Sequence, residues 1–193
     1  MKIKLLTQQA LTLVLALASL LPLTSLAQMC NSNALMTTPA SRFIDNGDGV
    51  LIDTKTHLMW QKCVDGKTGS SCETGTTQTY SWQTAFQRVE SLNNTTGFAG
   101  FVDWRLPNAK ELLSIMERSC MAPAINLQLF PNVTADVADV WSSTPYFAPG
   151  NFNDRALVAG FSGLGGISEN MKTYSRAIRL VRTVPESANL TAN

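Results

Sequence analysis

The feature that most constrains this chain is a set of four cysteines that follows an export signal. Lys2 and Lys4 precede an apolar run at 10–23, and Ser25-Leu26-Ala27 then matches the small-x-small pattern of a cleavage site. This arrangement is typical of a secretory signal peptide, 1–27, and we expect cleavage after Ala27. In an oxidising compartment, an even number of cysteines predicts disulfides that lock the folded body together.

The four cysteines, Cys30, Cys63, Cys72 and Cys120, allow three pairings. We favour Cys63–Cys72, because the segment between them is short and rich in Gly and Ser, and this leaves Cys30 to pair with Cys120. The loop-entropy model assigns about 2.7 kcal/mol to the short bridge and about 4.6 kcal/mol to the long one. A zinc site is the alternative, but the chain has no Cys-x-x-Cys and only one histidine.

Length and charge limit the function classes. Removing 27 residues from 193 leaves a mature chain of 166, which suits one domain. We expect a leader segment at 28–41, a folded domain at 42–183 and a disordered tail at 184–193. The chain has 15 basic and 14 acidic residues, and cleavage of the signal peptide removes two of the lysines, so the mature chain is near neutral. This balance argues against nucleic acid, and any anion must bind through a local patch.

The order of the expected elements favours an α+β fold with a mostly antiparallel sheet and two helices. Two short strands, 42–45 and 50–53, flank a turn-forming Asn-Gly-Asp-Gly and predict a hairpin. A helix begins after Ser81, with an apolar face at Trp82, Ala85, Phe86, Val89 and Leu92. Further strands are expected at 58–61, 140–143, 156–161 and 176–182.

The stretch Asp103 to Leu113, DWRLPNAKELL, predicts an extended arm that leads into a capped helix. Asn108 is the expected N-cap, and Glu111 three residues later completes a capping box. Alternation along the arm places Trp104 and Leu106 in the core and Arg105 on the other face. We expect Arg105 to pair with a carboxylate, and a ligand-facing Arg105 is the alternative.

No catalytic residue, metal ligand or cofactor is predicted. His57 is the only histidine, and its polar surroundings predict an exposed turn residue rather than a member of a triad. An EF-hand loop counted from Asp45 fails, because Gly47 occupies the third position and Thr56 the twelfth. The motifs of calcium-dependent lectins are also missing from the sequence, so we expect no calcium requirement.

The candidate ligand-binding residues gather around one long loop between two strands. Aromatic rings pack against sugars, and arginine forks pair with sulfates or carboxylates. For Trp141 we favour a core position, with a ligand-facing ring as the alternative. Lys172, Arg176, Arg179 and Arg182 give the C-terminal part a basic bias, and we interpret Arg179 and Arg182 as solvated strand residues. The candidates are Arg105, Trp141, Tyr146, Asn151, Asn153 and Arg155.

Several motifs together resemble a known bacterial family. DNGDGVLIDTKTHLMWQK, DWRLPNAKELL, FPN, WSSTPY and RAIRLVR, spread over residues 42–183, resemble the C-terminal domain of the Legionella collagen-like adhesin. The resemblance implies a C-type-lectin-like fold, related also to formylglycine-generating enzymes, and an exported protein. In the adhesin, the domain binds sulfated glycosaminoglycans. This chain differs in its near-neutral charge and in having no collagen-like stalk.

We therefore expect an exported, non-catalytic module that binds a glycan or an acidic surface polymer, in the periplasm, at the outer surface or secreted. The alternative is a structural or protein-interaction subunit of a cell-envelope or pilus assembly, with an envelope protein as its partner. We expect no transmembrane anchor in the mature chain.

Mass spectrometry of the protein isolated from cells should show a chain that begins at Gln28. A thiol reagent should not react with the denatured, unreduced protein, because all four cysteines are expected in disulfides. An uncleaved signal peptide, or four reactive thiols, would contradict export into an oxidising compartment.

Overall fold

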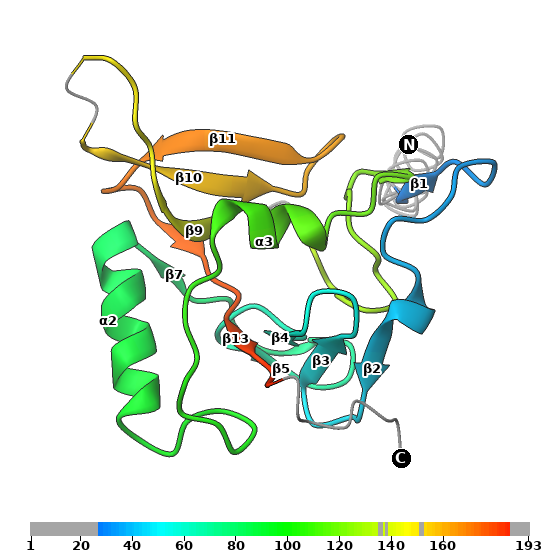
Figure 1. The fold of residues 1–193 in the computed structure, drawn as a ribbon, viewed down its shortest axis with the longest axis horizontal. Helices are drawn as coiled ribbons and strands as arrows, with labels where there is room; N and C mark the ends of the chain where they lie inside the picture. Colours follow the sequence, from blue (N-terminus) through cyan, green and yellow to red (C-terminus); the bar gives the residue numbers. More distant parts are fainter. Residues whose placement is uncertain (1–26, 135–136, 138, 151–152, 186–193) are drawn as a thin grey trace, which may run out of the picture.

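The structure, a computed structural model, describes residues 27–134, 137, 139–150 and 153–185. It is an α+β fold in which two sheets lie at opposite sides of the body, with a short helix between them and a longer helix along one flank (Figure 1). The larger sheet has the order β11-β10-β9-β12-β7, antiparallel except for one β12–β9 bridge. Its strands are β7 (Thr79–Tyr80), β9 (Asp139–Pro145), β10 (Arg155–Gly160), β11 (Gly166–Met171) and β12 (Arg176–Ala177).

The smaller sheet contains the hairpin that the sequence predicts. Its order is β13-β4-β3-β2, and every neighbouring pair is antiparallel. The β2–β3 turn contains Gly47 and Gly49 at φ of 80° and 87°, a backbone region that other residues rarely adopt. The strands are β2 (Phe43–Asp45), β3 (Val50–Asp53), β4 (Leu58–Gln61) and β13 (Val181–Thr183).

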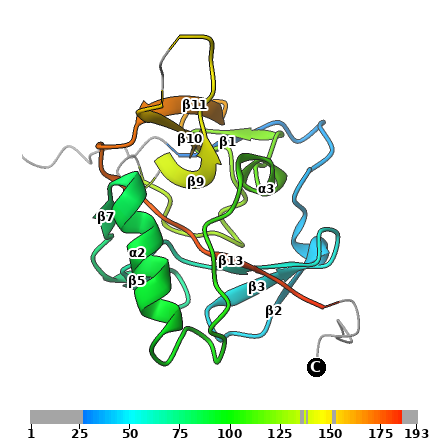
Figure 2. The same ribbon diagram turned by 60° about the vertical axis from the view of Figure 1, so that its left-hand side comes forward.

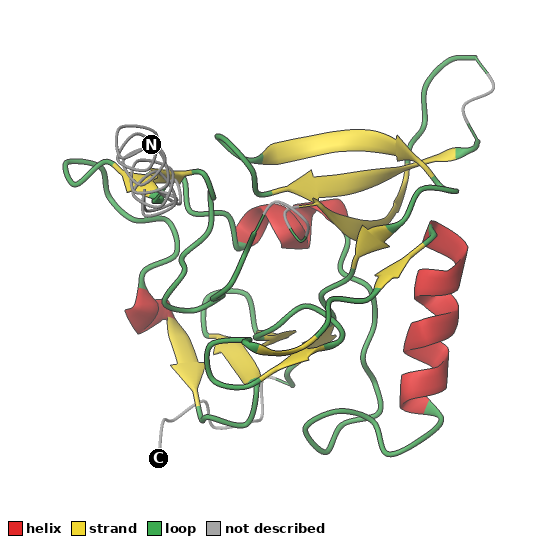
Figure 3. Cartoon of the chain, turned by 180° about the vertical axis from the view of Figure 1, so that it is seen from behind, coloured by secondary structure: helices red, strands yellow, loops and turns green. Residues whose placement is uncertain are grey.

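Both predicted helices are present (Figure 3). The longer helix, α2 (Trp82–Asn93), starts at Ser81, whose hydroxyl accepts a hydrogen bond from the Thr84 N–H. The shorter one, α3 (Ala109–Ser114), has the complete capping box between Asn108 and Glu111. The remaining elements are η1 (Ala40–Arg42) and two small ladders, β1 (Met29–Cys30) with β8 (Cys120–Met121) and β5 (Lys67–Thr68) with β6 (Thr74–Gly75). Among the described residues, no helix has the length and apolar character needed to cross a membrane.

Two apolar clusters fill the interior. One surrounds Trp60, Phe130 and Leu112, so α3 packs against both sheets. The other contains Trp104 and Trp141 and receives the Ala85–Val89 face of α2. Fully burying a large apolar side chain stabilises a fold by about 1.5–3 kcal/mol, so these clusters supply the main driving force for folding.

The final predicted strand, 176–182, is divided between the two sheets. β12 belongs to the larger sheet and β13 to the smaller one, with Arg179 in the crossing between them. Arg179 and Arg182, interpreted from sequence as solvated, are both buried, with relative exposures of 2% and 8%. Arg179 donates to the carbonyls of Gln61 and Lys62, and burial lowers the pKa of its guanidinium. Arg182 is paired with Asp103 at 2.7 Å, so its charge is compensated at the surface.

Both preferred disulfide pairings are confirmed. Cys63–Cys72 closes a short loop, and Cys30–Cys120 joins positions 90 residues apart. None of the four cysteines is free. The long bridge fastens the first described strand, β1, to β8 beside the body (Figure 2).

Described residues on both sides of the expected domain, 42–183, make defined contacts with the folded body. Thr37 and Thr38 donate hydrogen bonds to the buried carboxylate of Glu117 through their backbone N–H groups and their hydroxyls. At the other end, Val184 is buried, and its N–H donates to the His57 carbonyl. The folded body therefore begins before residue 42 and includes Val184, whereas 186–193 lie outside the described residues.

Glu117 should make the fold sensitive to acid. Burial acts to raise its pKa, but hydrogen bonds from Ser119, Thr37 and Thr38 outweigh this and lower the pKa to about 2 from the ordinary 4.5. A carboxylate whose pKa is lowered in the folded state stabilises the fold at pH values above its ordinary pKa. This stability is lost as the pH falls through the folded-state pKa. The contribution is about 3 kcal/mol at neutral pH.

We therefore expect Glu117→Gln to lower the free energy of unfolding at pH 7 by about 3 kcal/mol and to weaken its decline between about pH 5 and 2. Urea unfolding across that range measures both effects. Glu90→Gln, on the exposed face of α2, is the matched control. Equal stability of the Glu117 variant and the wild type at pH 7 would show that the carboxylate does not hold the leader.

Candidate functional site

The predicted binding loop, between β9 and β10, projects from one end of the larger sheet (Figure 1). Trp141, one of the candidates, is fully buried, and its indole N–H donates to the Tyr80 carbonyl at 2.8 Å. It is therefore a core residue and cannot contact a ligand, because β9 turns its ring inward against α2 and β7. Asn151 lies outside the described residues.

The other loop candidates are found near the base of the loop. The Tyr146 N–H donates to the Arg155 carbonyl at 3.1 Å, closing the two sides of the loop. The Arg155 guanidinium lies 3.4 Å from the Glu169 carboxylate on β11, and both side chains are partly exposed. Asn153 is exposed, and its carbonyl accepts a 2.6 Å hydrogen bond from the Lys172 ammonium. The structure thus brings Tyr146, Asn153 and Arg155 together.

Lys172 connects this loop to the start of α2. Its backbone N–H donates to the Asp154 carbonyl at 2.7 Å, and its own carbonyl accepts from the Trp82 N–H at 2.9 Å. The ammonium also lies 4.5 Å from the centroid of the Trp82 ring, a cation–π distance. The sequence shows Lys172 only as one of four basic residues near the C-terminus. It does not predict this connecting role, because the contacts of Lys172 join segments that are far apart in the chain.

A surface hollow of about 620 Å³ lies where Lys172 meets α2. We call it the aromatic hollow. The rings of Trp82 and Phe86 meet edge to face there, with centroids 4.8 Å apart. The helical pattern predicts both rings in the core, but α2 packs through the small side chains of Ala85 and Val89, and Phe86 remains 40% exposed. The hollow is lined further by Ser81, Gln83, Gln87, Glu90 and Thr173.

Arg105 has the structural role that the sequence favours. Its two terminal nitrogens donate to the two carboxylate oxygens of Glu111 at 2.8 and 2.7 Å. Burial acts to raise the pKa of Glu111, but the bonds from Arg105 and from the Asn108 N–H outweigh this and lower it. Arg105 therefore fixes the start of α3, apart from the loop of the other candidates.

The structure also contains a second concave surface, a groove of about 540 Å³ that the sequence did not indicate. We call it the disulfide groove, because the loop after Cys63 forms one of its walls. Arg88 of α2 contributes to the lining and pairs with the buried carboxylate of Asp65 through two hydrogen bonds of 3.0 and 3.1 Å. The Tyr80 hydroxyl donates to the same carboxylate at 2.6 Å. Burial and the Asp65 carboxylate raise the pKa of Tyr80 to about 12.

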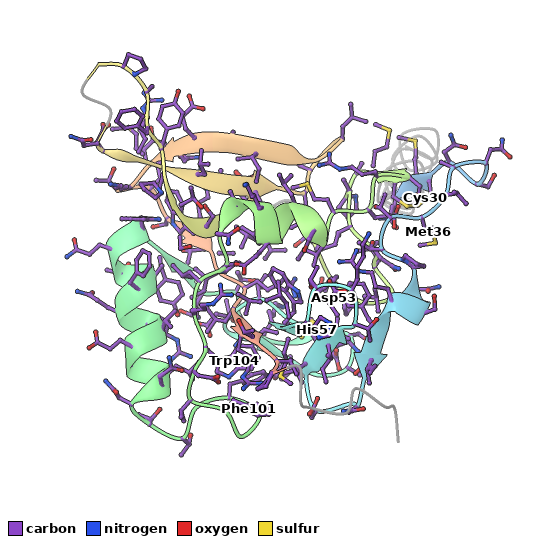
Figure 4. The ribbon with its side chains drawn as sticks, viewed as in Figure 1. Cys30, Met36, Asp53, His57, Phe101 and Trp104 are labelled. Atoms are coloured by element: carbon purple, nitrogen blue, oxygen red, sulfur yellow. A yellow bond between two sulfur atoms is a disulfide. The ribbon has the colours of Figure 1, made fainter. Side chains whose placement is uncertain are left out.

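His57 lies in a structural turn beside Asp53 (Figure 4). It is half-buried rather than exposed as expected, because its backbone adopts a φ of 54° and its carbonyl holds Val184. The buried Asp53 carboxylate accepts hydrogen bonds from Arg42, from the Lys55 N–H and from the Thr56 hydroxyl. Within the described parts of the chain, no three His, Cys, Asp or Glu side chains are grouped so that they could hold a metal ion.

These features define an α+β module, fastened by two disulfides, in which aromatic side chains of α2 lie close to basic side chains of β10 and of the β11–β12 connection. The model of the Lcl C-terminal domain family matches residues 49–182, well over half of the chain. The chain therefore belongs to this family, as the sequence motifs indicate. No curated protein matches the chain.

The Asp65–Tyr80 contact can be tested by titration. We expect Asp65→Asn to lower the pKa of Tyr80 from about 12 by about one unit, because the carboxylate that disfavours the tyrosinate is gone while burial remains. Ultraviolet absorbance of tyrosinate, measured in a background with Tyr146→Phe and Tyr174→Phe, reports Tyr80 alone. Asp45→Asn is the control, and an unchanged Tyr80 pKa in Asp65→Asn would contradict the assignment.

Proposed function

We propose that this protein is an exported, non-catalytic binding module that recognises a glycan or an acidic surface polymer. The observation that carries the proposal is the gathering of cations and aromatic rings at the loop end. Lys172 and Arg155 lie at the base of the β9–β10 loop, and Trp82 and Phe86 line the adjacent hollow. With a near-neutral chain, such a local patch is the means by which an anionic polymer binds.

The chemistry of these side chains suits a saccharide that carries acidic groups. The exposed part of Phe86 offers an apolar face to a sugar ring, while Gln83, Gln87 and Glu90 offer hydrogen-bond donors and acceptors around it. Sulfate or carboxylate groups on the same polymer would pair with Lys172, which lines the hollow, and with Arg176, which pairs with Tyr80 of β7 just before α2. The Arg176 guanidinium also lies 3.4 Å from the Asp139 carboxylate.

The setting of the proposal is a C-type-lectin-like body that acts in the periplasm or at the outer surface. The two disulfides support an oxidising compartment. Family membership supports the comparison with the adhesin domain described above. Under this proposal the loops carry recognition, and the two sheets keep them in place.

A protein-interaction role in an envelope assembly is the second candidate. It is supported by exposed apolar side chains at the end of the molecule where the leader is fastened. Met29, Leu35 and Met36 of the leader are 58%, 94% and 46% exposed, and Leu164 on the β10–β11 turn is 73% exposed. Gly163, beside Leu164, accepts a hydrogen bond from the Ala122 N–H just after β8, and β8 pairs with β1, so Leu164 lies near Met29.

A glycan array and a heparin column test the first proposal. We expect retention that decreases with salt, and the double variant Lys172→Gln/Arg176→Gln should bind about tenfold more weakly, since two cations of about 0.5–1 kcal/mol each are removed. Phe86→Ala should weaken binding to an arrayed glycan without changing the salt dependence.

Lys110→Gln, an exposed substitution on α3, removes one positive charge that lines neither the aromatic hollow nor the disulfide groove, and it is the control for net charge. If Lys110→Gln weakens retention as much, per charge removed, as the double variant Lys172→Gln/Arg176→Gln, binding is nonspecific. If no glycan binds at low salt, the glycan proposal is wrong. Co-purification with one envelope protein, insensitive to competing sugar and lost in Leu35→Ser, would then support the second candidate.

A further inference from the structure

We propose that the disulfide groove is a second binding site, specific for a small amphipathic carboxylate. The groove lies between the β2–β3 turn, the loop that follows β4 and the second half of α2, whereas the aromatic hollow involves the first half of α2. Its volume of about 540 Å³ is within the range of small-molecule sites. The occupant follows from the side chains that line it.

One wall is apolar and held in place by the core. The ring of Phe98 packs against Trp104 with centroids 5.6 Å apart, and the Trp104 indole N–H donates to the Phe98 carbonyl at 2.9 Å. Leu92 of α2 lines the groove beside it. At Gly49 a Cβ atom would lie only 3.2 Å from the Phe98 ring, so the glycine allows the ring to approach the β2–β3 turn closely. This wall suits an aromatic or aliphatic body.

The opposite wall is cross-linked. Residues 63–70 line the groove, and the Cys63–Cys72 disulfide closes the loop to which they belong. The Asn132 amide donates to the Cys72 carbonyl at 2.7 Å, which ties this loop to the body. One wall is thus held by the core and the other by the disulfide, so the groove is already formed without a ligand. Little conformational entropy is therefore lost when a ligand binds.

The acid-binding element is Arg88. Its Nε and one Nη2 hydrogen are used by Asp65, a buried carboxylate that orients the guanidinium, while no hydrogen bond from Nη1 occurs within the described residues. Because the guanidinium has five N–H donors, it can bind a second carboxylate while keeping the first. Asp65 thus positions Arg88 for an anion rather than consuming all of its donors.

Among the remaining charges of the groove, Lys67 is the one suited to the same ligand. Lys67 lines the groove and makes no ion pair within the described residues. The Lys62 ammonium is 2.7 Å from the Asp45 carboxylate, so these two charges cancel each other. Asp48, on the β2–β3 turn, also lines the groove, and its carboxylate accepts a hydrogen bond from the Val50 N–H at 3.3 Å. A carboxylate held by Arg88 and Lys67, with its apolar body against Leu92 and Phe98, matches the α2 wall and the disulfide-closed loop.

Isothermal titration and amide-resolved NMR with phenylacetate test this site in the mature protein. We expect saturable binding, with shifts at Leu92 and Phe98, and at least about tenfold weaker binding of phenylacetamide, which has the same ring without the charge. Lys67→Gln should weaken phenylacetate binding about threefold, since one partly exposed cation is removed, and should leave phenylacetamide unaffected.

Arg88→Gln alone would leave Asp65 buried without its partner and can disturb folding. The double variant Arg88→Gln/Asp65→Asn removes both charges and keeps hydrogen-bonding groups at both positions, so it should fold and lose at least about tenfold in phenylacetate affinity. Lys110→Gln is the control for net charge. The aromatic-hollow variant Phe86→Ala should bind phenylacetate like the wild type, which separates this site from the glycan proposal.

The proposal is overturned if phenylacetate does not saturate the groove, or if phenylacetamide binds equally well. It is also overturned if the folded double variant keeps wild-type affinity. Loss of glycan binding in the loop-end variants with intact phenylacetate binding would support two separate sites. Loss of both ligands in Phe86→Ala would contradict that separation.

Discussion

The crossing of the chain between the two sheets is the constraint on which the rest of the structure depends. β12 adds to the larger sheet and β13 to the smaller one within eight residues, so the sheets cannot move independently. Arg179 occupies the crossing and donates to two carbonyls at the end of β4. The arm before α3 joins the same point, because Arg105 pairs with Val181 through both backbone groups. Because a buried charge without hydrogen bonds is costly, these two carbonyl contacts limit how the chain can pass between the sheets.

The two concave surfaces both depend on that frame but use it differently. The aromatic hollow is at the start of α2, where Lys172 ties the β11–β12 connection and the β9–β10 loop to Trp82. The disulfide groove involves the second half of the same helix, with Phe98 supported by Trp104. One helix therefore contributes to both. Its burial through small residues at Ala85 and Val89 leaves longer side chains available at its edges.

Much of the fold was predictable because the signals are local. The glycine turn, the Ser81 cap and the Asn108–Glu111 capping box each involve residues within a few positions of one another, and each is present as expected. The site was harder to predict. Trp141 and Phe86 are both aromatic residues on amphipathic elements, and one proves buried and the other partly exposed. Periodicity assigns a face to a residue, but it does not say how closely a neighbouring element approaches that face.

What the sequence alone determined is the α+β order of elements, the disulfide pairing that we favoured and the family, since these follow from local patterns, cysteine spacing and motifs. The tertiary structure decided which charges are buried and which surfaces are concave. Arg179 is enclosed in the core, whereas Arg88 lines a groove beside Asp65. The difference arises because burial depends on contacts between segments more than 20 residues apart, such as Arg88 with Asp65, and no local pattern encodes these.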